Sequence, residues 1–167
     1  MSSTRPPDDP NARPAYRALE RWSPDRPETL VVCCSDGRFH AQIEEFVRHE
    51  VSERADLFSI PGGPACVDPW TSSFDEARVF EQAMRLFSTA HDLHSVWLVA
   101  HHGCASYALK HPGKKVEELR ALQLADLQTA RARILAAHPR YTVRCVFAAL
   151  VDEVVVFDDV GGAANAS

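Results

Sequence analysis

The chain has 167 residues, of which 46% are hydrophobic and 25% charged, with a formal net charge of −5. This length suits one domain around one hydrophobic core, and the composition is that of a globular chain rather than a fibrous or disordered one. The acidic balance argues against a basic surface for nucleic acid or anionic lipid, so we expect neither as a partner.

Compartment and redox state follow from two further features. The first residues are polar and rich in proline, and no run of about 18 apolar residues occurs, so we expect no membrane span and a cytoplasmic protein. The five cysteines are odd in number and spread along the chain. They favour reduced thiols or metal ligands over a disulfide framework.

Residues 1–27 are predicted to form an arm outside the main domain. Four prolines in the first 14 residues remove backbone donors and interrupt any apolar period. Tyr16, Leu19 and Trp22 recur at a spacing of three, which predicts a short amphipathic helix over 15–22. Such an arm would suit packing against a partner subunit.

Residues 28–160 are predicted to form a single α/β domain, followed by a flexible tail at 161–167. Apolar and β-branched runs predict its five strands, at residues 29–34, 56–60, 95–100, 141–147 and 153–157. Apolar residues at helical spacing predict a helix after the first strand, one beginning at Ser72 or Ser73, and one over about 114–137. The alternation predicts a mostly parallel four-stranded sheet with an added antiparallel edge strand and helices on both faces.

Three side chains suited to binding metal follow two of the predicted strands. Cys34 ends the first strand, and His101 and Cys104 follow the third in a His-x-x-Cys motif. Because ligands gather beyond the carboxyl ends of parallel strands, we expect these side chains to meet. Thiolate and imidazole are donors that Zn²⁺ prefers, and three protein ligands leave a fourth position for water, as in catalytic zinc sites. The other cysteines are interpreted as buried structural residues: Cys33, Cys66 and Cys145.

Cys-x-Asp-x-Arg at 34–38 and His-x-x-Cys at 101–104 resemble the paired signatures of the β-class carbonic anhydrases, and the resemblance extends over most of residues 28–160. It implies zinc as cofactor, held by Cys34, His101 and Cys104, with Asp36 and Arg38 as catalytic residues beside the fourth position. It also implies reversible hydration of carbon dioxide to bicarbonate by metal-bound hydroxide, and assembly into a homodimer or a higher homo-oligomer.

The resemblance gives Asp36 two states. In one, Asp36 accepts a hydrogen bond from the oxygen on the metal while Arg38 keeps the carboxylate ionised and in place. In the other, Asp36 leaves Arg38, takes the fourth zinc position and closes the site. His40 and His102 are the histidines nearest to the motifs, but we interpret both as solvated surface residues and neither as catalytic.

Three departures from the family pattern bear on substrate and rate rather than on zinc. The stretch 105–140 is short for the family, and Pro61-Gly62-Gly63-Pro64 replaces an Arg-Asn-Ala-Gly-like turn. Inside the two motifs, Gly37 and His102-Gly103 stand where family members commonly carry small polar residues. Two alternatives therefore stay open. One is hydrolysis of carbon disulfide or carbonyl sulfide on the same zinc site, and the other is a catalytically silent zinc-binding protein.

Overall fold

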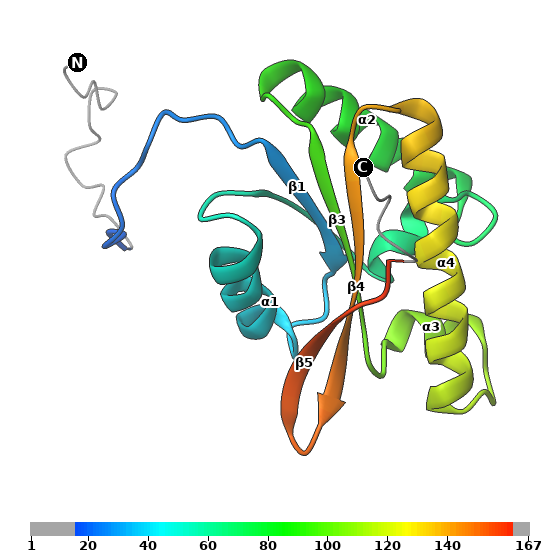
Figure 1. The fold of residues 1–167 in the computed structure, drawn as a ribbon. Helices are drawn as coiled ribbons and strands as arrows, with labels where there is room; N and C mark the ends of the chain where they lie inside the picture. The colour runs from blue at the N-terminus through cyan, green and yellow to red at the C-terminus, as the bar shows by residue number, and fades with distance from the viewer. Residues whose placement is uncertain (1–15, 162–167) are drawn as a thin grey trace, which may run out of the picture.

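A computed structural model describes residues 16–161 of the chain (Figure 1). All five predicted strands are present: β1 (Thr29–Cys34), β2 (Asp56–Ile60), β3 (Ser95–His101), β4 (Thr142–Val151) and β5 (Val154–Asp159). They form one sheet in the order β2-β1-β3-β4-β5, in which β5 pairs antiparallel with β4 and the other neighbours are parallel. The predicted sheet, including its antiparallel edge strand, is therefore confirmed.

Helices cover both faces of this sheet (Figure 1). On one face lies α1 (His40–Phe46), which continues as the π-helical turn η1 (Val47–Val51), and on the other lie α2 (Phe74–Ala90) and α4 (Val116–Ala137). Two short helices near the carboxyl ends of the strands were not predicted, the 3-10 helix η2 (Gly63–Val67) and α3 (Ala105–Lys110). Within residues 16–161, no helix is both long and apolar enough to cross a membrane.

The core lies on both sides of the central strands, because their alternate side chains point to opposite faces. Leu30 and Val32 of β1 pack on the side of α2 and α4, whereas Val31 and Cys33 pack on the side of α1. This two-sided burial explains why β1 reads as a continuous apolar run. Each fully buried valine or leucine contributes about 1.5–3 kcal/mol to folding.

The predicted helix over 15–22 was wrong, since residues 16–22 follow an irregular path. Tyr16, Leu19 and Trp22 are 78%, 92% and 86% exposed. A helix of two turns is unstable in water unless its apolar side packs on another surface, and within residues 16–161 these side chains stay exposed. Residues 1–15 of the predicted arm and 162–167 of the predicted tail lie outside the described residues.

Candidate metal centre

The three predicted ligands meet where β1 and β3 end. The two strands pair in parallel, with Cys33 opposite Val99, so Cys34 and His101 leave the sheet at the same edge. Cys104 lies at the N-cap of α3. Its Sγ is 3.9 Å from Cys34 Sγ, and the potential ligand atoms of all three residues lie within 4.8 Å of one another. Two sulfurs that each bind one tetrahedral ion at about 2.3 Å would be separated by roughly 3.8 Å, so this spacing suits a shared metal.

His101 presents a nitrogen atom that is ready to bind a metal. Its Nδ1 donates a hydrogen bond to the carbonyl oxygen of His102 at 2.9 Å, which leaves the lone pair on Nε2. The residue is only 1% exposed, and Nε2 has no hydrogen-bond partner among residues 16–161. The Phe39 ring packs against the imidazole, with 4.4 Å between centroids. A buried acceptor without a partner is costly, and a metal ligand is the role that would account for it.

The two thiol groups lie within hydrogen-bonding distance of each other, with 3.9 Å between their sulfurs. A hydrogen bond from Cys34 lowers the pKa of Cys104, and the Tyr107 backbone N–H lowers it further. The same hydrogen bond, with burial, raises the pKa of Cys34, although the Gly62 N–H lies 3.4 Å from its sulfur. A divalent cation that displaces the thiol protons would meet two thiolates and a neutral imidazole. The buried centre would then carry no net charge, which removes the main cost of burying ions.

Asp36 and Arg38 form an ion pair beside these ligands. Arg38 Nε donates to Asp36 Oδ1 at 2.9 Å and Nη2 donates to Oδ2 at 2.5 Å, a two-point contact that fixes the carboxylate plane. These hydrogen bonds hold the pKa of Asp36 well below its usual range. Arg38 Nη2 also donates to the Gly103 carbonyl at 3.1 Å. The ion pair is therefore tied to the loop between His101 and Cys104.

A cleft of about 610 Å³ opens beside the ligands, and its lining comes from three parts of the chain: Cys34 to Arg38, Pro61, and Ala105 with Ser106. The wall next to Cys34 depends on two glycines. Gly62 and Gly63 have φ angles of +83° and +56°, and a Cβ on Gly63 would lie 2.8 Å from the Cys34 backbone nitrogen. Only glycine allows η2 to approach β1 so closely. The sequence identified this segment as a turn but not its contact with Cys34.

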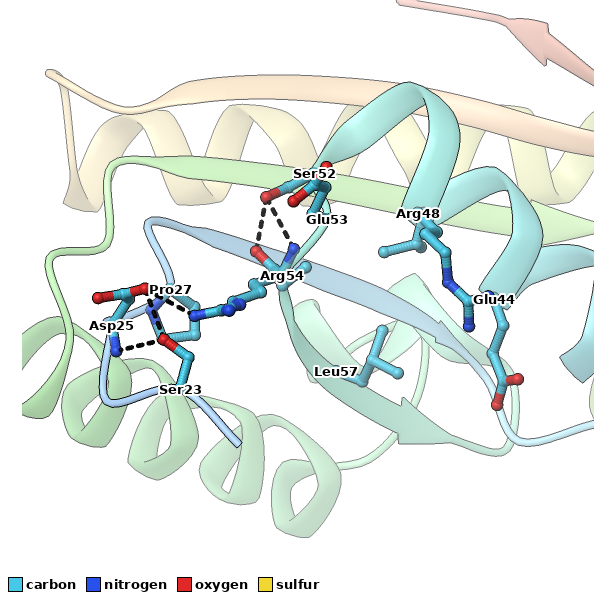
Figure 2. Close-up of a pocket in the computed structure, with 11 residues that line it drawn as sticks. Ser23, Asp25, Pro27, Glu44, Arg48, Ser52, Glu53, Arg54 and Leu57 are labelled. Carbon is cyan, nitrogen blue, oxygen red and sulfur yellow. Dashed lines mark hydrogen bonds and ion pairs between the residues drawn. The ribbon is translucent and has the colours of Figure 1, made fainter. Parts of the chain in front are cut away.

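A second cleft, of about 370 Å³, lies beside the opposite ends of β1 and β2 (Figure 2). Several of its polar groups form hydrogen bonds with one another. Asp25 accepts hydrogen bonds from Ser23 Oγ at 2.5 Å and Arg54 Nη1 at 2.8 Å, and Ser52 Oγ donates to the Arg54 carbonyl at 2.6 Å. In the described part of the chain, the one group of three potential metal ligands is Cys34, His101 and Cys104. We therefore place the candidate site at the carboxyl ends of the strands.

The histidines and cysteines that were interpreted as non-ligands are not part of the ligand cluster. His40 is exposed, and His102 contributes its backbone, accepting from His101 and donating to Ala148. The structural cysteines are all buried and free: Cys33, Cys66 and Cys145. Sequence analysis missed two long-range polar contacts, a buried one from Gln123 to His101 and a partly buried one from Tyr107 to Asp126. No local pattern marks either contact, because both join residues that are distant in sequence.

Comparison with known proteins identifies one family. The family model described as "Putative carbonic anhydrase" matches residues 25–150. Among solved structures, the β-carbonic anhydrase CcaA is 13% identical with a TM-score of 0.56, covering 81% of this chain and 74% of that one. A carbonic anhydrase from Streptococcus mutans is 10% identical with a TM-score of 0.55, covering 83% and 86%.

A tetrameric β-carbonic anhydrase from Sordaria macrospora is 12% identical with a TM-score of 0.50, covering 80% of this chain and 81% of that one. At such identities these structural likenesses concern the fold. No curated protein sequence matches the chain.

Proposed function

Because this chain belongs to the β-carbonic anhydrase family, we propose that it is a zinc enzyme that catalyses the reversible hydration of carbon dioxide to bicarbonate. Cys34, His101 and Cys104 hold the zinc in this proposal. The observation that carries it is the buried, unpartnered Nε2 of His101 facing two thiol sulfurs. Two thiolates and an imidazole are donors that suit zinc, and they leave a coordination position open.

When bound, the zinc supplies a Lewis acid that lowers the pKa of a coordinated water to about 7. Asp36 accepts a hydrogen bond from the attacking water and orients its lone pair toward carbon dioxide. Arg38 keeps the Asp36 carboxylate ionised and prevents it from rotating, through the two N–H groups that it donates. Pro61 and Ala105 line the cleft without a charge, which suits a small uncharged substrate.

The Asp36–Arg38 hydrogen bonds support the open form of the site, in which Asp36 stays off the metal. In the closed form, Asp36 would exchange these bonds for a metal bond, so the two forms could differ by only a few kcal/mol. A pH–activity profile without a steep loss below about pH 8 would count against the closed form.

The test is stopped-flow hydration of carbon dioxide by protein of known zinc content, from about pH 6.5 to 9. We expect activity in proportion to zinc, and loss of both zinc and activity in Cys34→Ser. Cys145→Ala is the matched control, because Cys145 is a buried cysteine outside the ligand cluster and its loss should leave zinc bound.

Protein that binds zinc without hydrating carbon dioxide would contradict the proposed reaction. The same samples would then be assayed with carbon disulfide and carbonyl sulfide. Turnover of either would identify a hydrolase on the same zinc, and zinc without any turnover would identify a catalytically silent zinc protein.

We also propose that the chain acts in the cytoplasm as a homodimer or a higher homo-oligomer. The exposed side chains of Tyr16, Leu19 and Trp22 support a role for the N-terminal arm in assembly, because large apolar groups gathered in one short exposed segment favour a partner surface. The Sordaria macrospora relative is itself tetrameric. Deleting residues 1–26 should lower the mass measured by light scattering, and an unchanged mass would contradict a role for the arm.

A further inference from the structure

Helix α4 carries three polar side chains that reach the segments bearing the candidate ligands. The first is Gln123, which is 3% exposed and whose Nε2 donates to the backbone carbonyl of His101 at 3.0 Å. A glutamine in a core loses its hydration and is retained only where a partner replaces it. Gln123 therefore fixes the end of β3 at the residue that carries the imidazole.

The second contact holds the short helix that begins at Cys104. Asp126 accepts a hydrogen bond at 2.6 Å from the hydroxyl of Tyr107, a buried residue one turn after Cys104. Helix α3 has six residues and no side-chain cap at its N-terminus, so it is too short to be stable alone. Its position depends on packing and on this hydrogen bond from its third residue.

The third contact reaches the Cys34 side of the centre. Arg133 Nε lies 2.8 Å from Oδ1 of Asp68, a buried residue that directly follows η2. At its other end η2 meets the Cys34 backbone, where Gly63 leaves no room for a Cβ. The ion pair therefore ties α4 to the segment that packs against Cys34.

We propose that α4 is the positioning element of the metal centre, with Gln123 acting on His101, Asp126 acting on Cys104 through Tyr107, and Arg133 acting on Cys34 through Asp68. This inference rests on the proposed zinc site. None of these α4 side chains is among the grouped metal ligands, so their effect is on the geometry of the ligands. Ligands held at the correct spacing bind more tightly, and the loss of outer contacts of this kind lowers metal affinity by about 10–100-fold.

Helix α4 also packs into the core through Leu127, Ala130 and Ile134, so the test must separate positioning from stability. Tyr107→Phe and Gln123→Met each remove one polar contact and keep most of the side-chain volume. Tyr141→Phe is the matched control, because it removes a hydroxyl that lies 2.9 Å from Ser88 Oγ near the amino ends of the strands.

Three quantities are measured on each full-length variant: the zinc dissociation constant by chelator competition, the absorption spectrum of the Co²⁺-loaded protein, and urea unfolding of the metal-free protein. We expect Tyr107→Phe and Gln123→Met to bind zinc about 10-fold more weakly and to shift the Co²⁺ spectrum. Tyr141→Phe should unfold more easily but bind zinc within about 2-fold of wild type. Asp126→Asn keeps an oxygen for the Tyr107 hydroxyl and should retain affinity that Asp126→Leu loses.

Unchanged zinc affinity and an unchanged Co²⁺ spectrum in both Tyr107→Phe and Gln123→Met would overturn the inference and leave the proposed function intact. A wild-type protein that binds no zinc would overturn the proposed function, and this inference with it. If one of the two variants does not fold, the other decides, because each tests a separate contact of α4.

Discussion

The two ends of the parallel sheet differ in how deeply they bury polar residues. At the carboxyl ends His101, Cys104 and Gln123 are buried, next to the more exposed Asp36–Arg38 pair. At the amino ends polar residues form exposed ion pairs, such as those of Arg54 with Asp25 and of His94 with Glu28. Both ends also carry a cleft, of about 610 Å³ beside the candidate ligands and about 740 Å³ beside the amino ends. The size of a cleft therefore does not distinguish the two ends.

What distinguishes the two ends is the free energy that the fold loses by placing polar groups there. An exposed ion pair costs little to form and contributes about 0–1 kcal/mol, so such pairs occur without any function. A buried lone pair without a partner, such as His101 Nε2, costs free energy in the metal-free fold. Polar groups that a fold buries at a cost are better markers of function than the shape of its surface.

The strongest test of this contrast compares two aspartates that each pair with an arginine. Asp36→Asn should lower the rate of carbon dioxide hydration by about 100-fold or more, because the neutral amide cannot stabilise the reacting groups as the carboxylate does. Zinc content should not change. Asp25→Asn, at the amino ends, should leave the rate as it is. Stopped-flow assays with metal analysis measure both, and equal rates in the two variants would remove the functional contrast between the ends.

A second test compares two glycines with positive φ. Gly63→Ala adds a Cβ 2.8 Å from the Cys34 backbone nitrogen and should lower the free energy of unfolding by about 3 kcal/mol. Gly113 has a φ of +84° but open space around it, so Gly113→Ala should cost only about 1–2 kcal/mol of backbone strain. Urea unfolding measures both. A cost for Gly63→Ala no larger than that for Gly113→Ala would mean that η2 can move away from Cys34.

The strands and the ligand cluster could be predicted because their signals are local. β1 and β3 are buried on both faces and so read as unbroken apolar runs, and parallel pairing brings Cys34 and His101 to one edge. The pairing of Asp36 with Arg38 also follows from a spacing of two residues. Each signal lies in a short stretch of sequence, and a general rule of parallel sheets then brings the stretches together.

The remaining features could not be predicted because distant contacts decide them. Gln123 reads as a surface residue of a helix, yet it is buried against a carbonyl 22 residues away in the sequence. Helix α3 is too short to show a period, and the predicted helix near Trp22 lacks a surface to pack against. Val116 shows the reverse, since it is apolar and yet exposed at the first turn of α4.

The smallest expected effect concerns the pH dependence of the Asp25–Arg54 pair. Hydrogen bonding from Ser23, and then the Arg54 charge, lower the pKa of Asp25 in the folded state. A lowered folded pKa means that the carboxylate stabilises the fold above its ordinary pKa of about 3.9 and loses this effect as the pH falls through the lowered value. The melting temperature of the wild type should be slightly higher than that of Asp25→Asn at neutral pH, and this difference should disappear below about pH 4. A difference independent of pH would contradict this origin.

Cys34 and Cys104 are separated by 70 positions in the sequence but by 3.9 Å between their sulfurs, so the ligand cluster exists only once β1 and β3 have paired. A metal ion that binds only the folded chain shifts the folding equilibrium by mass action, by about 4.1 kcal/mol when its free concentration is 1,000 times its dissociation constant. The centre would then act as a reversible cross-link between two distant parts of the chain. The measured stability of this protein would accordingly depend on the free metal concentration of the solution.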